Sequence, residues 1–330
     1  MQGAYRFGFE TASGEDLCGV DEARWSLVGA DPSLPLLSGQ FPASDGASVP
    51  YRLWPARAPR ALLLCLHGAF DFCGSFDEIG PELRRHGFAV LAIDQRGFGR
   101  TASRGRWSGK TRMTEDVVDA ARFLRARYGH SVPLFVLGES MGAAVAVHAA
   151  ARDPSFSGLV LVAPGAVTGG WQKLLGAYIM RAVNAILPDS AFTAERISAW
   201  EYTPGAGLRL MCDPLVLRRA RPAMLLGLFR LAISAVDAAR SVRVPALTLV
   251  GGRDDLLRLA CIARLHAELA GPKQWRLFRF GPHLLLHWKH RERVLSRIVR
   301  WLDGQLASGC TSEFEHFSSQ VPCSILPGRL

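Results

Sequence analysis

VPLFVLGESMGAAVAVHAA, residues 132–150, carries the clearest structural signal in this chain. It is a short apolar run that breaks at GESMG, residues 138–142, and continues as an alanine-rich segment, which predicts a strand, a sharp turn and a helix. A serine at the apex of such a turn, here Ser140, adopts a strained backbone conformation that exposes its hydroxyl, and the flanking glycines give clearance. The stretch is therefore typical of a displayed nucleophile.

The residue after Ser140 adds a second chemical feature to this turn. The backbone N–H of Met141 stands at the amino terminus of the predicted helix, where unpaired donors and the helix dipole favour a developing oxyanion. A Gly-x-Ser-x-Gly match alone is weak, because chance can supply one in a chain with 33 glycines. The strand and helix predicted on either side give the match its weight.

The composition is that of a globular protein without a metal or disulfide framework. The chain has 330 residues, 49% hydrophobic and 21% charged, which suits one large α/β domain or two small ones. Its seven cysteines are scattered and form no Cys-x-x-Cys pair, which argues against a zinc site and against a disulfide framework.

The amino-terminal residues show no basic start followed by an apolar run, and no stretch reaches about 18 charge-free apolar residues. These features predict a cytoplasmic protein. The formal charge of +10 is spread along the chain, without aromatic interleaving or a nucleic-acid motif, so no nucleic-acid partner is expected. The charge fits attraction to an anionic membrane surface or a phosphorylated lipid, and it fits a merely solvated basic surface as well.

Apolar runs alternate with amphipathic segments along most of the chain. A hairpin over residues 41–56, turning at Asp45-Gly46, predicts an antiparallel sheet edge. Strands are expected at 61–66, 88–93, 133–137, 158–163, 245–250 and 274–280, and helices at 75–85, 114–128 with Thr114 as N-cap, 143–151, from after Asp255 to about 270, and 290–306. Strands that are apolar on both faces and alternate with helices predict a mostly parallel, doubly wound α/β sheet.

The strand rhythm stops at Pro164 and resumes after Val242. We expect a helical cap at about 165–242, inserted after the sixth strand, over a domain that spans 39–304. An apolar stripe in the cap, formed by Trp171, Leu174, Leu175, Tyr178 and Ile179, suits an acyl chain, and it suits another packing layer equally. Residues 1–38 are expected to be an extension of unknown purpose, and 305–330 a poorly ordered tail.

A serine nucleophile needs a base, and the base needs an acid that sets its tautomer. Functional side chains in open α/β sheets come from loops after the carboxyl ends of strands. After Ser140, an acid follows a strand at once at Asp254, with Asp255 as the alternative, and a histidine does so at His283. Serine, then aspartate, then histidine is the chain order of α/β-hydrolases.

The chain has nine histidines, so His283 has competitors. His67 ends a strand before the nucleophile and suits a supporting role in an oxyanion loop. His287 and His290 lie beyond the strand-end loop, towards the last helix. The others lie on predicted helices or far from any strand end: His86, His130, His148, His266 and His316. His283 is therefore the preferred base.

Five motifs together resemble the monoacylglycerol lipase and lysophospholipase branch of the α/β-hydrolases. They are HGAF (67–70), DQRGFGR (94–100), GESMG (138–142), GGRDD (251–255) and GPH (281–283), the last followed by Val294-Leu295. The resemblance covers about residues 40–304 and includes Asp213-Pro214 in the cap. The chain departs from the fuller lipase pattern in Ala69-Phe70-Asp71 after the HG, and in Leu284 where that pattern has an acidic residue.

By position, the resemblance implies Ser140 as nucleophile, Asp254 as acid and His283 as base, with the N–H groups of Ala69 and Met141 as the oxyanion hole. It implies hydrolysis of the ester of a single-chain lipid, a monoacylglycerol or a lysophospholipid, with no metal and no organic cofactor. Four arginines of the cap suit either a lysophospholipid phosphate or a plain solvated face: Arg209, Arg218, Arg219 and Arg221.

Other activities share this arrangement. A small-ester carboxylesterase, an aminopeptidase of the same fold and an acyltransferase that excludes water all remain alternatives, as does a non-catalytic binding protein. A serine at the turn argues against haloalkane dehalogenases and epoxide hydrolases, which place an aspartate there. The sequence carries no indication of the oligomeric state.

Overall fold

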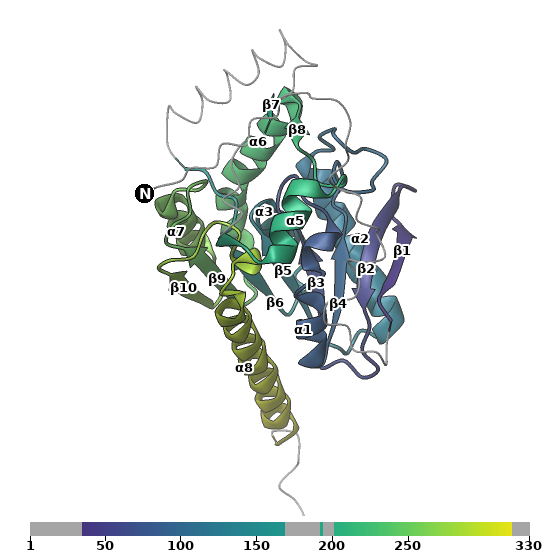
Figure 1. The fold of residues 1–330 in the computed structure, drawn as a ribbon. Helices are drawn as coiled ribbons and strands as arrows, with labels where there is room; N and C mark the ends of the chain where they lie inside the picture. The colour runs from purple at the N-terminus through teal and green to yellow at the C-terminus, as the bar shows by residue number, and fades with distance from the viewer. Residues whose placement is uncertain (1–34, 169–191, 194–200, 319–330) are drawn as a thin grey trace, which may run out of the picture.

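An eight-stranded sheet runs through the part of the chain that the computed structural model describes, residues 35–168, 192–193 and 201–318 (Figure 1). The strand order is β1-β2-β4-β3-β5-β6-β9-β10. The strands are β1 (Leu37–Pro42), β2 (Ser48–Trp54), β3 (Ala61–Leu66), β4 (Phe88–Ile93), β5 (Leu134–Glu139), β6 (Gly158–Val162), β9 (Ala246–Gly251) and β10 (Lys273–Phe278). From β4 to β10 all neighbours pair in parallel, which confirms the predicted mostly parallel α/β sheet.

The antiparallel edge is formed by β1 and β2, as the hairpin pattern predicts. β1 pairs antiparallel with β2, and β2 pairs antiparallel with β4. Gly46 turns the chain between β1 and β2 with a φ of +82°, a conformation that glycine adopts without strain. Because β1 begins at Leu37, the sheet starts slightly before the end of the extension predicted over residues 1–38.

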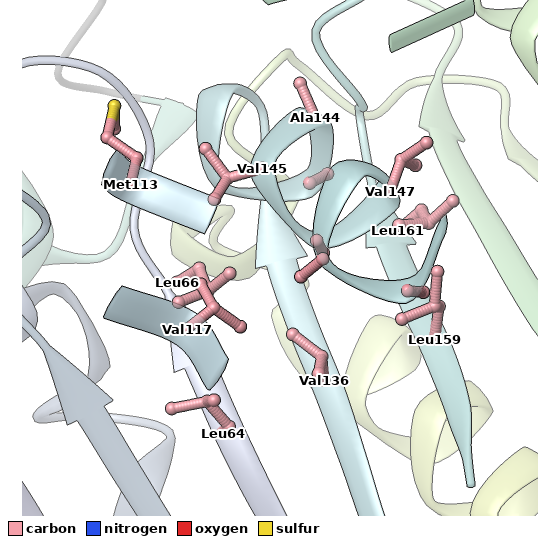
Figure 2. Packing of buried hydrophobic residues seen from close by; sticks show 14 of the residues in the cluster. Leu64, Leu66, Met113, Val117, Val136, Ala144, Val145, Val147, Leu159 and Leu161 are labelled. Carbon is pink, nitrogen blue, oxygen red and sulfur yellow. The ribbon is translucent and has the colours of Figure 1, made fainter. Parts of the chain in front are cut away.

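Alternate residues of β3 divide the core into two layers. Leu62, Leu64 and Leu66 pack in the layer that contains α2 (Lys110–Tyr128) and α3 (Met141–Arg152). Leu63 and Cys65 pack in the other layer, with side chains of α1 (Gly80–Arg85) and α8 (Arg291–Ser318). Figure 2 shows part of the first layer, in which Val145 and Val147 of α3 lie over the strands that carry Leu66 and Leu161. Each fully buried leucine contributes about 1.5–3 kcal/mol, so the two layers dominate the stability of the sheet.

The insertion after β6 contains helices and a small strand pair. It includes α5 (Pro204–Cys212), α6 (Pro222–Ala238) and the short helix η4 (Ala239–Ser241). The expectation of a purely helical cap is wrong in one respect, because β7 (Phe192–Thr193) pairs antiparallel with β8 (Arg219–Ala220). The predicted apolar stripe from Trp171 to Ile179 lies outside the described residues.

Three predicted helix boundaries are corrected. The helix expected over 75–85 is divided into η2 (Cys73–Phe76) and α1, because Pro81 has no N–H to continue the ladder. Thr114 is not an N-cap: α2 begins at Lys110, and the Thr114 hydroxyl donates to the Lys110 carbonyl 2.8 Å away. α8 continues past the expected end near Leu306 to Ser318, so the tail predicted to be poorly ordered from 305 is helical at its start.

One helical segment, Pro222–Ser241, is long and apolar enough to cross a membrane by length and composition, with a mean hydropathy of 1.5. Of its most apolar window, 44% is buried inside the structure, where α6 packs against α3 and α7 (Leu259–Glu268). Core helices of globular proteins share these properties, so the segment gives only weak support for a membrane span.

The contact between α3 and β3 at Gly142 generates a stability prediction. A Cβ at Gly142 would lie 2.2 Å from the Leu66 carbonyl oxygen, a backbone atom that cannot move aside cheaply. We expect Gly142→Ala to lower the free energy of unfolding by about 1–3 kcal/mol, measured by urea denaturation. The control is Gly304→Ala in α8, where a Cβ meets nothing within 4 Å and should add about 0.5–1 kcal/mol. A Gly142→Ala protein as stable as the wild type would contradict this account of the contact.

Candidate active site

Ser140 occupies a strained turn between β5 and α3. Its φ of +53° and ψ of −113° are unusual for a residue with a side chain. Backbone hydrogen bonds hold the turn in place: the Ser140 N–H donates to the Val162 carbonyl at 2.9 Å, and the Gly165 N–H donates to the Ser140 carbonyl at 2.9 Å. Since a Cβ at Gly138 would lie 2.5 Å from the Ala143 nitrogen, this turn requires glycine there.

The structure brings the predicted base and acid to Ser140. His283 Nε2 lies 2.9 Å from Ser140 Oγ, and His283 Nδ1 lies 2.7 Å from Asp254 Oδ2. A carboxylate beside Nδ1 requires the proton on that nitrogen, which leaves Nε2 to accept the hydrogen bond of the serine hydroxyl. The side chains of His283 and Asp254 are 4% and 3% exposed, so this chain of hydrogen bonds is shielded from water.

The loops after β9 and β10 are joined by backbone hydrogen bonds, which place the acid against the base. The Gly252 N–H donates to the Phe278 carbonyl at 2.8 Å, and the Arg253 N–H donates to the Gly281 carbonyl at 2.9 Å. The other carboxylate oxygen of Asp254 accepts from two N–H groups of the following turn, at 3.0 and 2.8 Å. Hydrogen bonds within its own loop thus fix the orientation of the Asp254 carboxylate, independently of its contact with His283.

The loop after β3 lies directly beside the nucleophile. A Cβ at Gly68 would be 3.6 Å from the Ser140 Cβ, so the backbone that leads into Ala69 adjoins the serine. Met141 is the first residue of α3, where backbone N–H groups have no acceptor within the helix. Both segments predicted to supply the oxyanion hole therefore meet at Ser140, and the role of the two N–H groups stays a prediction.

The buried His67 supports this loop through hydrogen bonds. Its Nδ1 donates to the Gly68 carbonyl at 2.7 Å, and its Nε2 accepts from the Gln95 N–H at 3.0 Å. The Gln95 side-chain amide in turn donates to the His67 carbonyl at 2.7 Å. Burial lowers the pKa of His67, so the ring stays neutral and can both donate and accept. These bonds agree with the supporting role predicted for this histidine.

The DQRGFGR motif contributes bracing to the site. Asp94 accepts from the N–H groups of Cys73 and Arg100, both at 2.7 Å, and so ties η2 to the turn after β4. Arg96 pairs with Asp116 at 2.8 Å and with Asp45 at 2.6 Å, which links that turn to α2 and to the hairpin. These contacts join the turn after β4 to η2, to α2 and to the hairpin, so the motif holds the surroundings of the site.

The other buried or half-buried histidines bond elsewhere. His148 Nε2 lies 3.0 Å from Ser234 Oγ, and burial lowers the pKa of His148 to about 4. His266 Nδ1 lies 2.9 Å from Thr248 Oγ1, and the exposed His290 packs edge-on against Trp288. His287 is buried beside Glu139, with 3.3 Å between Nε2 and Oε2. Among the described side chains, His283 is therefore the histidine that is hydrogen-bonded to Ser140.

A buried set of charged residues near the site has no counterpart in the sequence predictions. It consists of Asp71, Glu139, Arg209 and His287. The pattern that assigns Arg209 to phosphate binding is wrong, because its guanidinium is buried against the Asp71 carboxylate. Arg218 donates to the Met211 carbonyl, while Arg219 and Arg221 are exposed. An acid inside the apolar turn, Glu139, was the one local signal of such a set.

Comparisons with known proteins identify the family of this chain and proteins of similar sequence and fold. The family profile described as "Serine aminopeptidase, S33" matches residues 57–288. The chain is 30% identical over 280 residues to the monoglyceride lipase of Rattus norvegicus, covering 80% of this chain and 89% of that relative. It is 30% identical over 261 residues to phospholipase YtpA of Bacillus subtilis, covering 76% and 98%. The solved structure of Paleococcus ferrophilus monoacylglycerol lipase shares the fold, with a TM-score of 0.65 at 20% identity over 82% of this chain and 100% of that one.

The two adjacent aspartates after β9 provide a matched test of the acid. Asp254→Asn keeps the shape of the side chain but favours the wrong tautomer of His283, so Ser140 should react with a fluorophosphonate roughly 10³–10⁴ times more slowly. Asp255 is exposed on the same loop, and Asp255→Asn should leave this rate within about twofold. The measurement is the second-order rate of labelling. Equal slowing in both variants would rule out the specific role of Asp254.

Proposed function

Because the chain belongs to the serine aminopeptidase S33 family and is a carboxylic ester hydrolase of α/β-hydrolase fold, we propose that it cleaves the ester of single-chain lipids. The substrates are monoacylglycerols or lysophospholipids, and the reaction passes through an acyl-enzyme on Ser140. In this proposal His283 is the base, Asp254 the acid, and the N–H groups of Ala69 and Met141 are the oxyanion hole.

One observation carries the proposal of mechanism. His283 is hydrogen-bonded at 2.9 Å to Ser140 through one ring nitrogen and at 2.7 Å to Asp254 through the other. A hydroxyl is a weak nucleophile at neutral pH, and a base within hydrogen-bond reach removes its proton as it attacks. A carboxylate on the far side of the ring stabilises the imidazolium that forms. The three groups therefore have the arrangement that acylation requires.

The reaction follows from this arrangement in two stages. Ser140 Oγ attacks the ester carbonyl while its proton passes to His283 Nε2, and the resulting oxyanion accepts hydrogen bonds from the N–H groups of Ala69 and Met141. The imidazolium then returns the proton to the leaving alcohol as the C–O bond breaks, which leaves an acyl-serine. In the second stage water attacks the acyl group, with His283 again as base, and the fatty acid leaves as Ser140 is regenerated.

The choice of a lipid ester rests on the relatives and on the cap. Two relatives at 30% identity are a monoglyceride lipase and a phospholipase. The cap helix α5 exposes Leu208 and Met211, which are 47% and 44% exposed, and so presents apolar surface on the insertion. With the exposed cations Arg219 and Arg221 nearby in the chain, this surface suits peripheral contact with an anionic membrane. A cytoplasmic location remains part of the proposal.

A peptide amide is the second candidate substrate, because the matching family profile carries the description of an aminopeptidase. The same triad and oxyanion hole cleave esters and amides alike, so the site geometry does not separate them. Acyl transfer to an alcohol, in place of hydrolysis by water, uses the same acyl-enzyme. The rates of ester hydrolysis, amide hydrolysis and acyl transfer, measured on one preparation of the enzyme, therefore decide among these candidates.

The first measurement concerns the nucleophile. Ser140→Ala should lower kcat for p-nitrophenyl butyrate by about 10⁶, because no acyl-enzyme can form. The variant loses only a hydroxyl, and its unfolding midpoint should match that of the wild type and show that the fold is intact. Turnover retained in Ser140→Ala would overturn the assignment of the triad.

The second measurement concerns the substrate. We expect kcat/KM for 1-monooleoylglycerol or oleoyl lysophosphatidylcholine to exceed that for alanine p-nitroanilide by at least about 10², since the anilide lacks the long apolar chain that the cap would bind. A panel of these three compounds, with p-nitrophenyl acetate as a small ester, compares the candidates directly. Fastest cleavage of the anilide would favour the aminopeptidase, and fastest cleavage of the acetate a small-ester carboxylesterase.

A further inference from the structure

Arg209 of the cap helix α5 lies buried against the loop that follows β3. The Arg209 side chain is 7% exposed and that of Asp71 is 8% exposed, and the guanidinium bonds to both carboxylate oxygens of Asp71. Burial by itself would raise the pKa of Asp71, but the charge and hydrogen bond of Arg209, together with the nearby His287 and His67, outweigh that effect and the pKa is lowered. Asp71 is therefore a carboxylate, and it depends on a cation that the cap supplies.

The pair continues into a chain of charged groups that reaches the nucleophile turn. Arg209 lies 3.4 Å from His287 Nδ1, and His287 Nε2 lies 3.3 Å from Glu139 Oε2. The other oxygen of Glu139 accepts from the Leu286 N–H at 3.0 Å. Glu139 precedes Ser140, and Leu286 follows His283 in the same loop. This chain therefore connects the cap to the segments that carry the proposed nucleophile and the proposed base.

Asp71 also closes the turn that contains Ala69. The Asp71 N–H donates to the Gly68 carbonyl at 3.4 Å, and the Asp71 carboxylate accepts from the Phe72 N–H at 2.9 Å. Between them Phe70 has a φ of +70°, a strained conformation for an aromatic residue. A second bond from the cap holds it, because the Leu217 N–H donates to the Phe70 carbonyl at 2.7 Å. The strained turn around Ala69 is thus fastened to the cap at two points.

We propose that Arg209 is a positioning residue that acts through Asp71 to hold the turn at Ala69, so that the Ala69 N–H is directed at the developing oxyanion. This inference rests on the proposed function. Its physical basis is that oxyanion donors must be held rigidly at the position where charge develops. In this enzyme the cap, rather than the sheet alone, supplies that rigidity, and acylation requires the cap to be docked on the loop.

The test is a cycle of variants on p-nitrophenyl butyrate. Arg209→Met and Asp71→Asn should each lower kcat by about 10²–10³ with KM changed by less than about threefold, as for a lost oxyanion donor. The double variant should be no slower than the slower single variant, because both changes disrupt one unit. Arg209→Lys restores the charge without the fork, and should recover part of kcat. Independent, multiplying losses would overturn the proposal.

A second readout separates positioning from mere stabilisation. A trifluoromethyl ketone forms a tetrahedral oxyanion with the serine, so its Ki should rise in the Asp71 and Arg209 variants as kcat/KM falls. A purely structural role would reduce the fraction of enzyme titrated by fluorophosphonate and leave the Ki of the remainder unchanged, and that result would overturn the proposal. If Arg209→Met does not fold, Asp71→Asn and Arg209→Lys carry the test.

The matched control is an exposed ion pair far from the site. Arg60 and Asp303 are 2.7 Å apart and are 50% and 43% exposed, so Arg60→Met and Asp303→Asn should leave kcat and the Ki unchanged. The proposed function is tested independently of this inference. If it is wrong, Ser140→Ala retains turnover, regardless of the kinetics of the Arg209 variants. If Ser140→Ala is inactive but Asp71→Asn has the kinetics of the wild type, the result contradicts only the positioning role and leaves the proposed function intact.

Discussion

Ser140 is held in a left-handed backbone conformation by hydrogen bonds to β6 and to the segment after it, and the remaining parts of the site are arranged around this turn. The turn exists because glycines on both sides let α3 approach the ends of β3 and β5, where any side chain would collide with backbone atoms. The strain costs of order 1–3 kcal/mol, which the two buried layers of the sheet offset. Its benefit is that the hydroxyl points out of the sheet towards His283.

Two kinds of contact then complete the site. Backbone hydrogen bonds between the loops after β9 and β10 bring Asp254 to His283, and they depend only on neighbouring parallel strands ending at one edge. The cap is attached differently, through charges buried beneath it. Removing one partner of a buried ion pair leaves an uncompensated charge and costs about 3–5 kcal/mol, so Asp71 of the β3 loop and Arg209 of the cap each depend on the other.

Much of the fold was predictable because its signals are local. Apolar runs and the turn residues after them identify the strands and place Ser140, Asp254 and His283 at strand ends. Helix boundaries were less predictable: Thr114 has the chemistry of an N-cap, yet its hydroxyl bonds back to Lys110 inside the helix. The choice of His283 over His287 also followed from position, since His283 lies in the loop after β10 and His287 lies beyond it, within η5 (Leu285–His287).

The sequence alone specified a parallel α/β sheet, a nucleophile turn and the order of serine, acid and histidine, because each is written in residues close together in the chain. The tertiary structure decided which distant charges meet. Asp71 and Arg209 are 138 residues apart, and nothing in either segment indicates its partner. The sequence around an arginine of the cap is the same whether its side chain faces solvent or a buried carboxylate. Only the packing of the cap on the loop distinguishes the two cases.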